Sequence, residues 1–183
     1  WVNTRDMKAA HAREHCASEG ESYGSNYKPC PDTVAFNSGK GGTTYQACTV
    51  NGGPSGIMAA GMAKAWDLMV KQAANEKVTI TLREAFRSYE QQVNRRCRYE
   101  EGWGHPASKP GAGNARHQKG IAVDLNAKYV AGNIAKGVGP VYDWLVKPHA
   151  THPASTNAAV YGFTRDPGEA WHWNWSAAGA IIK

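Results

Sequence analysis

The sequence predicts an α+β fold, with a small, mostly antiparallel sheet and helices packed against one side of it. Apolar residues recur at helical spacing across residues 57–75, whereas β-branched residues alternate with others across 77–86. Such segments are mixed along the chain without the regular strand–helix–strand alternation of a parallel sheet. The 183 residues and a hydrophobic content of 42% suit one domain with a proper core.

The predicted elements of the larger part of the chain, residues 56–183, follow in order without an internal repeat. Ser88 is placed to cap the helix that follows it, and Pro140 suits the first turn of another. The expected elements are a helix over 57–75, a strand over 77–86, a helix over 89–101, a Gly/Pro loop over 102–116, a strand over 120–126, a helix over 140–147 and a strand over 171–175.

Residues 1–55 are expected to form an N-terminal segment that packs on the same domain. A short helix is predicted over 2–16, and the Gly, Ser, Thr, Asn and Pro content of 17–55 predicts irregular structure. Four cysteines without a CxxC pair exclude a zinc ribbon and favour two disulfides in an oxidising compartment. The four are Cys16, Cys30, Cys48 and Cys97. Three pairings stay open, and four buried free thiols in a cytosolic protein are the alternative.

The charge balance favours an anionic partner. A formal net charge of +6 suits nucleic acid, an acidic membrane surface or an acidic cell-wall polymer. No nucleic-acid-binding motif is present, and no apolar run is long enough to span a bilayer. A chain that begins at Trp1 is expected to be a mature form, which together with the cysteines predicts a secreted or cell-envelope protein.

Four separated residues form a candidate catalytic metal centre. His117, Asp124 and His172 are a complete three-ligand set for zinc, which leaves one coordination position for water. Glu169 lies three residues before His172, where its carboxylate could take a proton from that water. The set therefore predicts metal-assisted hydrolysis of an amide bond.

The predicted strands explain how these residues could meet. Asp124 shares one face of its strand with Ala122, and His172 shares a face of the last strand with Asn174. If the two strands are neighbours, Asp124 and His172 converge, and Gly120 lets the backbone bend so that His117 folds over the same point. Each residue taken alone is more often a surface or hydrogen-bonded side chain, so the hypothesis depends on the joint pattern.

The same residues resemble the zinc D-alanyl-D-alanine carboxypeptidase and dipeptidase family, the M15 group, which also contains L-alanyl-D-glutamate endopeptidases. That family shows SxHxxGxAxD followed by ExxHxH or ExxHW, and this chain has HQKGIAVD from His117 to Asp124 and EAWHW from Glu169. An upstream YRSYEEQ-like segment of the family is matched by FRSYEQQ over 86–92. The resemblance covers roughly residues 57–175 and implies a fold shared with D,D-peptidases and Hedgehog domains.

The resemblance also implies roles for individual residues. It implies Zn²⁺ bound by His117, Asp124 and His172, with Glu169 as the catalytic base. By the same resemblance Arg87 is expected to stabilise the oxyanion, and the residues expected to bind substrate are Gln92, Ser88 and Trp173. The family usually has Ser two residues before the first ligand, where this chain has Ala115, which leaves endopeptidase activity open.

The function expected from these observations is that of a zinc metallopeptidase acting on peptidoglycan stem peptides or cross-links. An endopeptidase is slightly favoured over a D,D-carboxypeptidase, and a dipeptidase stays open. The enzyme is expected to act as a monomer, either as a secreted wall enzyme or as a phage lysin. The alternative is a non-catalytic, zinc-containing binding module of Hedgehog-like fold, against which Glu169 and Arg87 argue.

Other polar clusters carry less weight. Arg83, Arg87, Arg95, Arg96 and Arg98 could form a cationic rim for stem-peptide carboxylates, or simply a solvated helix face. His11 and His15 stand four apart and could chelate a metal on a helix, although an exposed face is the simpler interpretation. No role is assigned to His149 and His152, which are expected to lie in a loop between prolines.

Overall fold

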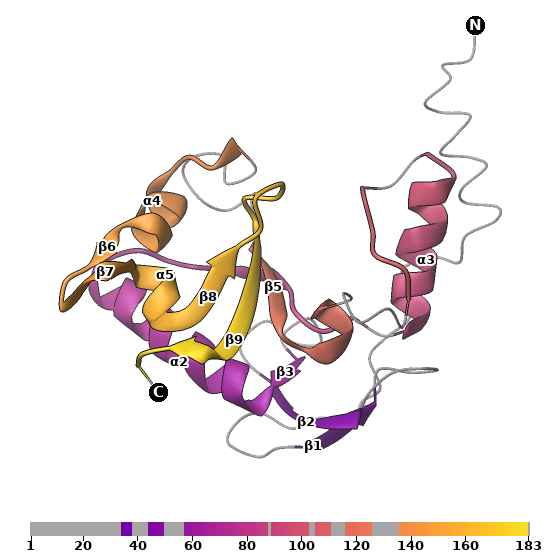
Figure 1. Ribbon diagram of the computed structural model, residues 1–183, viewed down its shortest axis with the longest axis horizontal. Helices are drawn as coiled ribbons and strands as arrows, with labels where there is room; N and C mark the ends of the chain where they lie inside the picture. Colours follow the sequence, from indigo (N-terminus) through magenta and orange to yellow (C-terminus); the bar gives the residue numbers. More distant parts are fainter. Residues whose placement is uncertain are drawn as a thin grey trace, which may run out of the picture.

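The chain folds as α+β around a four-stranded antiparallel sheet, as the sequence predicts (Figure 1). The computed structural model describes residues 34–37, 44–49, 57–87, 89–102, 105–110, 116–125 and 136–182. The sheet has the order β4-β5-β9-β8, and its strands are β4 (Leu82–Glu84), β5 (Ala122–Leu125), β9 (His172–Ala180) and β8 (Tyr161–Arg165).

The register of the two inner strands separates a core face from a polar face. Val123 lies opposite Trp173, and both side chains are buried in the hydrophobic core. The next pair along the ladder, Asp124 and His172, must point to the other face because successive side chains of a strand alternate. Trp173 and Val123 therefore anchor the sheet from behind while their neighbours project from its polar face.

The helix α2 (Ala60–Asn75) covers the core face, in contact with β8 and β9. Its buried stripe includes Met62, Trp66 and Met69, spaced so that they lie on one side of the helix. Trp66 meets Phe163 of β8 edge to face, with ring centroids 6.2 Å apart. Burying each such side chain contributes about 1.5–3 kcal/mol, so this stripe attaches the helix firmly to the sheet.

A glycine at the start of α2 permits close approach to β9. A Cβ atom built on Gly61 would lie 2.8 Å from Cη2 of Trp175, which is shorter than carbon atoms tolerate. The indole of Trp175 is held in this position by its N–H, which donates to the carbonyl oxygen of Tyr161 at 3.1 Å. The first turn of the helix and the middle of β9 therefore pack in direct contact.

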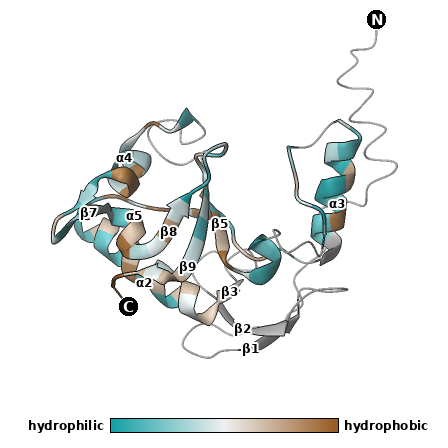
Figure 2. Cartoon of the chain, in the orientation of Figure 1, coloured by the Kyte–Doolittle hydropathy of each residue, from teal (hydrophilic) through white to brown (hydrophobic). Residues whose placement is uncertain are grey.

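The remaining elements surround this core. The helix α3 (Tyr89–Glu100) stands to one side of the sheet and is largely hydrophilic (Figures 1 and 2). The others are the 3₁₀ helix η2 (Arg116–Lys119), α4 (Pro140–Val146), the two-stranded hairpin of β6 (Pro148–His149) and β7 (His152–Thr156), and α5 (Asn157–Val160). Pro140 lies in the first turn of α4, as predicted. No helix in the described ranges is long and apolar enough to cross a bilayer.

Several boundaries differ from the predictions. The strand expected over 77–86 is confined to β4, and Lys77 instead has a left-handed φ of 63° just after α2. Two strands, β1 (Val34–Asn37) and β2 (Thr44–Thr49), occur where irregular structure was expected, and β3 (Ile57–Ala59) precedes the helix. These three form a second antiparallel sheet of order β1-β2-β3. The helix predicted over 2–16 lies outside the described residues.

Cys97 on α3 is disulfide-bonded. The predicted pair of disulfides and their connectivity therefore stay predictions.

Candidate metal centre

The three predicted ligands come from the polar face of the sheet and the turn before it. Asp124 and His172 are directly opposite each other in the β5–β9 ladder. His117 lies on η2, and Gly120 follows it with a φ of 63°, a conformation that glycine adopts without strain. The turn is closed by two backbone hydrogen bonds, in which the N–H groups of Gly120 and Ile121 donate to the carbonyl oxygens of His117 and Arg116. The predicted bend at Gly120 is thus confirmed.

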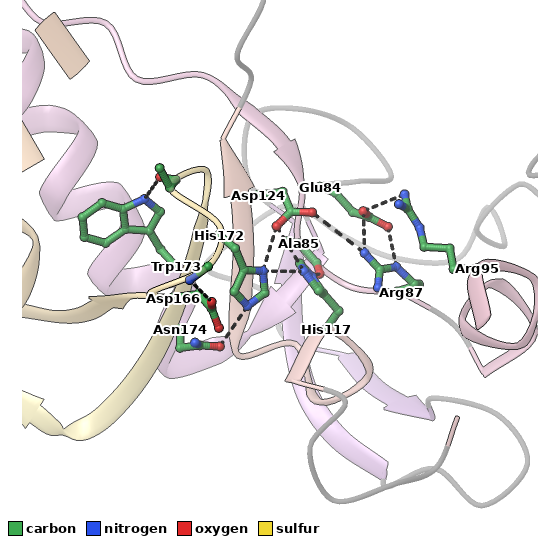
Figure 3. A network of polar contacts seen from close by, with 12 residues as sticks. Glu84, Ala85, Arg87, Arg95, His117, Asp124, Asp166, His172, Trp173 and Asn174 are labelled. Carbon is green, nitrogen blue, oxygen red and sulfur yellow. Dashed lines mark hydrogen bonds and ion pairs between the residues drawn. The ribbon is translucent and has the colours of Figure 1, made fainter. Parts of the chain in front are cut away.

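One nitrogen of each histidine and one oxygen of Asp124 form a tight triangle (Figure 3). His172 Nδ1 lies 2.8 Å from Asp124 Oδ1, and His117 Nε2 lies 3.3 Å from the same oxygen. The two imidazole nitrogens are 3.1 Å apart. All three residues are largely buried, with His117 and Asp124 each 6% exposed.

The outer nitrogen of each imidazole faces a carbonyl-type oxygen, which fixes where its proton sits. His117 Nδ1 is 2.5 Å from the backbone oxygen of Ala85, and His172 Nε2 is 3.0 Å from Oδ1 of Asn174. These oxygens accept hydrogen bonds, so the ring protons belong on the outer nitrogens. The inner nitrogens then present lone pairs toward each other and toward a carboxylate, an arrangement that a cation stabilises.

The donor set fits zinc. Tetrahedral bonds of 2.0–2.1 Å place neighbouring nitrogen ligands about 3.3 Å apart, close to the separations found here. Two imidazoles and one carboxylate are ligands that zinc accepts in catalytic sites, where a fourth position is left to solvent. Within the described residues the group has three members, His117, Asp124 and His172.

The electrostatics of the triangle favour an ionised carboxylate. Burial alone would raise the pKa of Asp124, but when the imidazoles are protonated the charge of His117 and the hydrogen bonds from both rings outweigh it and hold that pKa far below its usual range. Burial alone would lower the pKa of His172, yet the bond and charge of Asp124 raise it overall. Asp124 therefore carries a negative charge at neutral pH.

Glu169 stands at the entrance to β9, beside the triangle. Its backbone oxygen accepts from the N–H of His172 at 2.9 Å, and its own N–H donates to Asp166 at 3.4 Å. The side chain is half-buried, and this burial raises the pKa of Glu169, with smaller and partly opposing effects of nearby charges, among them His172 and Asp124. A carboxylate that lies beside a metal site and has a raised pKa is suited to receive and release a proton.

A buried ionic network supports the far side of Asp124 (Figure 3). The guanidinium of Arg87 lies 3.9 Å from Asp124 Oδ2 and donates through Nε and Nη2 to Glu84, at 2.9 and 2.8 Å. Arg95 of α3 donates to the same Glu84 carboxylate at 2.9 Å. Glu84 is the Cα partner of Asp124 across the β4–β5 pair, which places the network next to the triangle.

The residues expected to bind substrate are distributed differently. Gln92 is buried, accepts from Arg87 Nη1 at 2.8 Å and donates to the Ser108 carbonyl oxygen at 2.7 Å. Trp173 is 3% exposed in the core behind the sheet, so the expectation that it contacts substrate is corrected: the alternation along β9 points it away from His172. Ser88 and Ala115 lie outside the described residues.

The basic cluster is not one free rim. Arg95 pairs with Glu84, and Arg96 pairs with Glu100 at 2.7 Å and also donates to the backbone oxygen of Ala107. Glu84 and Asn174 are the supporting residues whose parts the sequence did not assign. Asn174 could have been found from its shared strand face with His172, whereas nothing local to Glu84 indicated two arginine partners.

Comparisons with known proteins place the fold in a class. No protein-family model and no curated protein matches the chain. Solved structures of peptidoglycan peptidases do match, so the chain has the α+β fold of these D,D- and L,D-peptidases, as its sequence resemblance implied.

Three of these structures illustrate the extent of the match. A D,D-pentapeptidase VanY mutant from a VanB-type vancomycin resistance cassette, in complex with Zn(II), has a TM-score of 0.51 and 18% identity over 72% of this chain and 78% of its own. The LdcB LD-carboxypeptidase has a TM-score of 0.53 and 20% identity over 85% and 71%. VanYB in complex with D-alanine-D-alanine has a TM-score of 0.51 and 16% identity over 85% and 86%.

Proposed function

We propose that the chain is a zinc-dependent peptidase that hydrolyses amide bonds in peptidoglycan stem peptides or cross-links. The observation that carries the proposal is the triangle of His117 Nε2, Asp124 Oδ1 and His172 Nδ1, with every side at most 3.3 Å. The solved neighbours lend support, since one is a D,D-pentapeptidase holding Zn(II) and another is an LD-carboxypeptidase.

The proposed mechanism assigns a part to each polar residue of the site. Bound zinc would supply Lewis acidity and would lower the pKa of a bound water to about 7. Glu169, half-buried beside His172, would take the proton of the attacking water and pass it to the leaving amine nitrogen. Asn174 and the Ala85 carbonyl would keep the two imidazoles in the tautomers that expose their inner lone pairs.

Arg87 is proposed to stabilise the negative charge that develops on the scissile carbonyl oxygen. A cation is most effective in this role when it is fixed before the reaction begins. Arg87 is fixed by Glu84 on one side and by Gln92 on the other. Because both ends of the Gln92 amide have protein partners, we propose that Gln92 positions Arg87 rather than touching the substrate.

Which peptide bond the enzyme cuts can be identified from its reaction products. Ala115, in place of the family's Ser, favours an endopeptidase, whereas the solved neighbours named above include a D,D-pentapeptidase and an LD-carboxypeptidase. Incubation of the zinc-loaded chain with purified muropeptides, followed by mass analysis, identifies the bond: loss of a terminal residue indicates a carboxypeptidase, and internal cleavage an endopeptidase.

The decisive variant is Glu169→Gln, which keeps the shape of the side chain and removes its basicity. We expect it to bind zinc as the parent does and to lose about 10²–10⁴-fold in turnover. Asp166→Asn is the matched control, since Asp166 lies three residues earlier and its side chain bonds the Gly168 N–H instead. Full activity of Glu169→Gln would refute the assigned base, and absence of products from the parent with retained muropeptide binding would favour a binding module.

A further inference from the structure

The β6–β7 hairpin brings two histidines together on a part of the fold that the proposed reaction does not use. His149 ends β6, His152 begins β7, and the two are Cα partners across a two-residue turn. Directly opposed residues of an antiparallel pair project to the same face, with Cβ atoms about 4.5–5.5 Å apart. The hairpin thus corrects the loop expected here, and it lies away from β5 and the metal centre (Figure 1).

The two imidazoles face each other through the same atom. His149 Nδ1 and His152 Nδ1 are 3.4 Å apart, and their ring planes are inclined by 47°. That distance is long for an N–H···N hydrogen bond, which is best near 2.9–3.0 Å. It is close to the separation of about 3.3 Å expected for two imidazole ligands of one tetrahedral zinc ion.

The local hydrogen bonds show which ring nitrogen of His149 is unprotonated. The backbone N–H of Thr151 donates to His149 Nδ1 at 3.3 Å, so this nitrogen is an acceptor and does not carry the ring proton. The Thr151 hydroxyl lies 2.9 Å from His152 Nδ1 and 3.3 Å from His149 Nδ1. Two imidazole nitrogens and a hydroxyl oxygen therefore gather within a few ångströms at the tip of the hairpin.

The surroundings hold His149 in place and add negative charge. His149 is 8% exposed, and its ring stands edge to face with Tyr161, at a centroid separation of 6.5 Å. Nearby, the carboxylate of Glu76 accepts from the side-chain amide of Gln72 at 2.9 Å and from the indole N–H of Trp144 at 3.0 Å. These hydrogen bonds lower the pKa of Glu76 and the charge of Lys147 also lowers it, so a metal ion at the hairpin and Lys147 would both be attracted to this carboxylate.

We propose that His149 and His152 form a second site, for a divalent transition-metal ion of the zinc, nickel or copper(II) class. Imidazole nitrogens suit these ions, and the Nδ1 atoms would be the two protein ligands, with solvent or the Thr151 hydroxyl completing the shell. The site is separate from the His117–Asp124–His172 triangle. It requires no peptidase activity, and with fewer protein ligands it is the weaker of the two.

The test measures metal binding to the whole chain with the three-ligand centre already loaded with zinc. Added Ni²⁺ or Cu²⁺ is expected to broaden the NMR signals of Thr151 and of both imidazoles, with one further equivalent bound by equilibrium dialysis. His152→Ala, at the partly exposed end of the pair, is expected to lose that equivalent and to keep the parent's peptidase turnover. His15→Ala is the matched control for the other histidine pair of the sequence and is expected to keep both equivalents.

Two results would overturn the proposal. One is a parent chain in which the Thr151 and imidazole signals stay sharp as the paramagnetic ion is added, a reading that needs no variant and so survives any folding defect of His152→Ala. The other is a stably folded His152→Ala chain that binds as many equivalents as the parent. Either would leave the proposed peptidase centre untouched, because turnover and the tightly bound zinc are measured separately.

Discussion

Replacement of Glu84 by Gln is predicted to destabilise the fold strongly, because Glu84 is the buried counter-ion of two arginines. One carboxylate oxygen accepts from Arg87 Nε at 2.9 Å, and the other accepts from Arg87 Nη2 at 2.8 Å and from Arg95 Nη2 at 2.9 Å. Gln keeps one acceptor oxygen and puts an NH₂ group among the remaining donors. With that oxygen facing the two Nη2 donors, the charge-assisted hydrogen bond from Arg87 Nε is lost, worth about 1.5–3 kcal/mol, and the buried Arg87 loses its nearest charge partner.

The expected cost is about 3–5 kcal/mol of unfolding free energy, as for other buried pairs that lose one member. For a chain of this size that corresponds to a fall in Tm of roughly 6–20 °C. Urea unfolding followed by circular dichroism measures it. The control is Glu100→Gln, whose partner Arg96 lies 2.7 Å away but whose side chain is 57% exposed, so that its loss should cost less than about 1 kcal/mol.

The destabilisation caused by Glu84→Gln is also expected to depend on pH. Burial alone would raise the pKa of Glu84, but the hydrogen bond and charge of Arg87, with the charges of His117 and Arg95, lower it below its usual value of 4.5. A lowered pKa in the fold means that the stabilisation is fully present above pH 4.5 and is lost as the pH falls through the lower value. The difference in unfolding free energy between the parent and Glu84→Gln should therefore become smaller as the pH is lowered. If Glu84→Gln lowered the unfolding free energy by less than about 1 kcal/mol at neutral pH, no more than Glu100→Gln does, the reasoning would be refuted.

Two further changes test other parts of the account. Asn174→Ala removes the oxygen that faces His172 Nε2, so the zinc affinity should fall by about 10–100-fold while the fold persists; an unchanged affinity by competition with a chelator would contradict the role. Gly162→Ala should cost more than about 1–2 kcal/mol, because φ is +87° and the new Cβ would lie 2.5 Å from the Ser176 carbonyl oxygen. Gly168→Ala, whose Cβ would lie 3.5 Å from the nearest atom, should be close to neutral when both variants are compared by urea unfolding, and equal effects at the two glycines would argue against the strain.

The ligand triangle could be predicted because its geometry follows from local rules. Asp124 and His172 lie on strands, where the alternation of faces follows directly from the sequence, and Gly120 marks the bend that returns His117. The helix α2 and the short helix α4 were predicted for the same reason, since their apolar spacing and Pro140 are local signals.

What could not be predicted depends on contacts between distant segments. Glu84 and Arg95 are eleven residues apart and meet only because α3 packs near β4, so neither residue shows its partner in the sequence. The β6–β7 hairpin turns through Ala150 and Thr151, which lack the Gly or Asn that usually announces such a turn. The pairing of His149 with His152 was hidden for that reason.

The central claim is that His117, Asp124 and His172 hold one zinc ion tightly. The most direct measurement is the zinc content of purified chains after dialysis against a weak chelator, which strips ions held by fewer ligands. We predict one retained equivalent in the parent and in His152→Ala, and none in a folded His172→Ala chain. Equal zinc retention by His172→Ala and the parent would contradict the account.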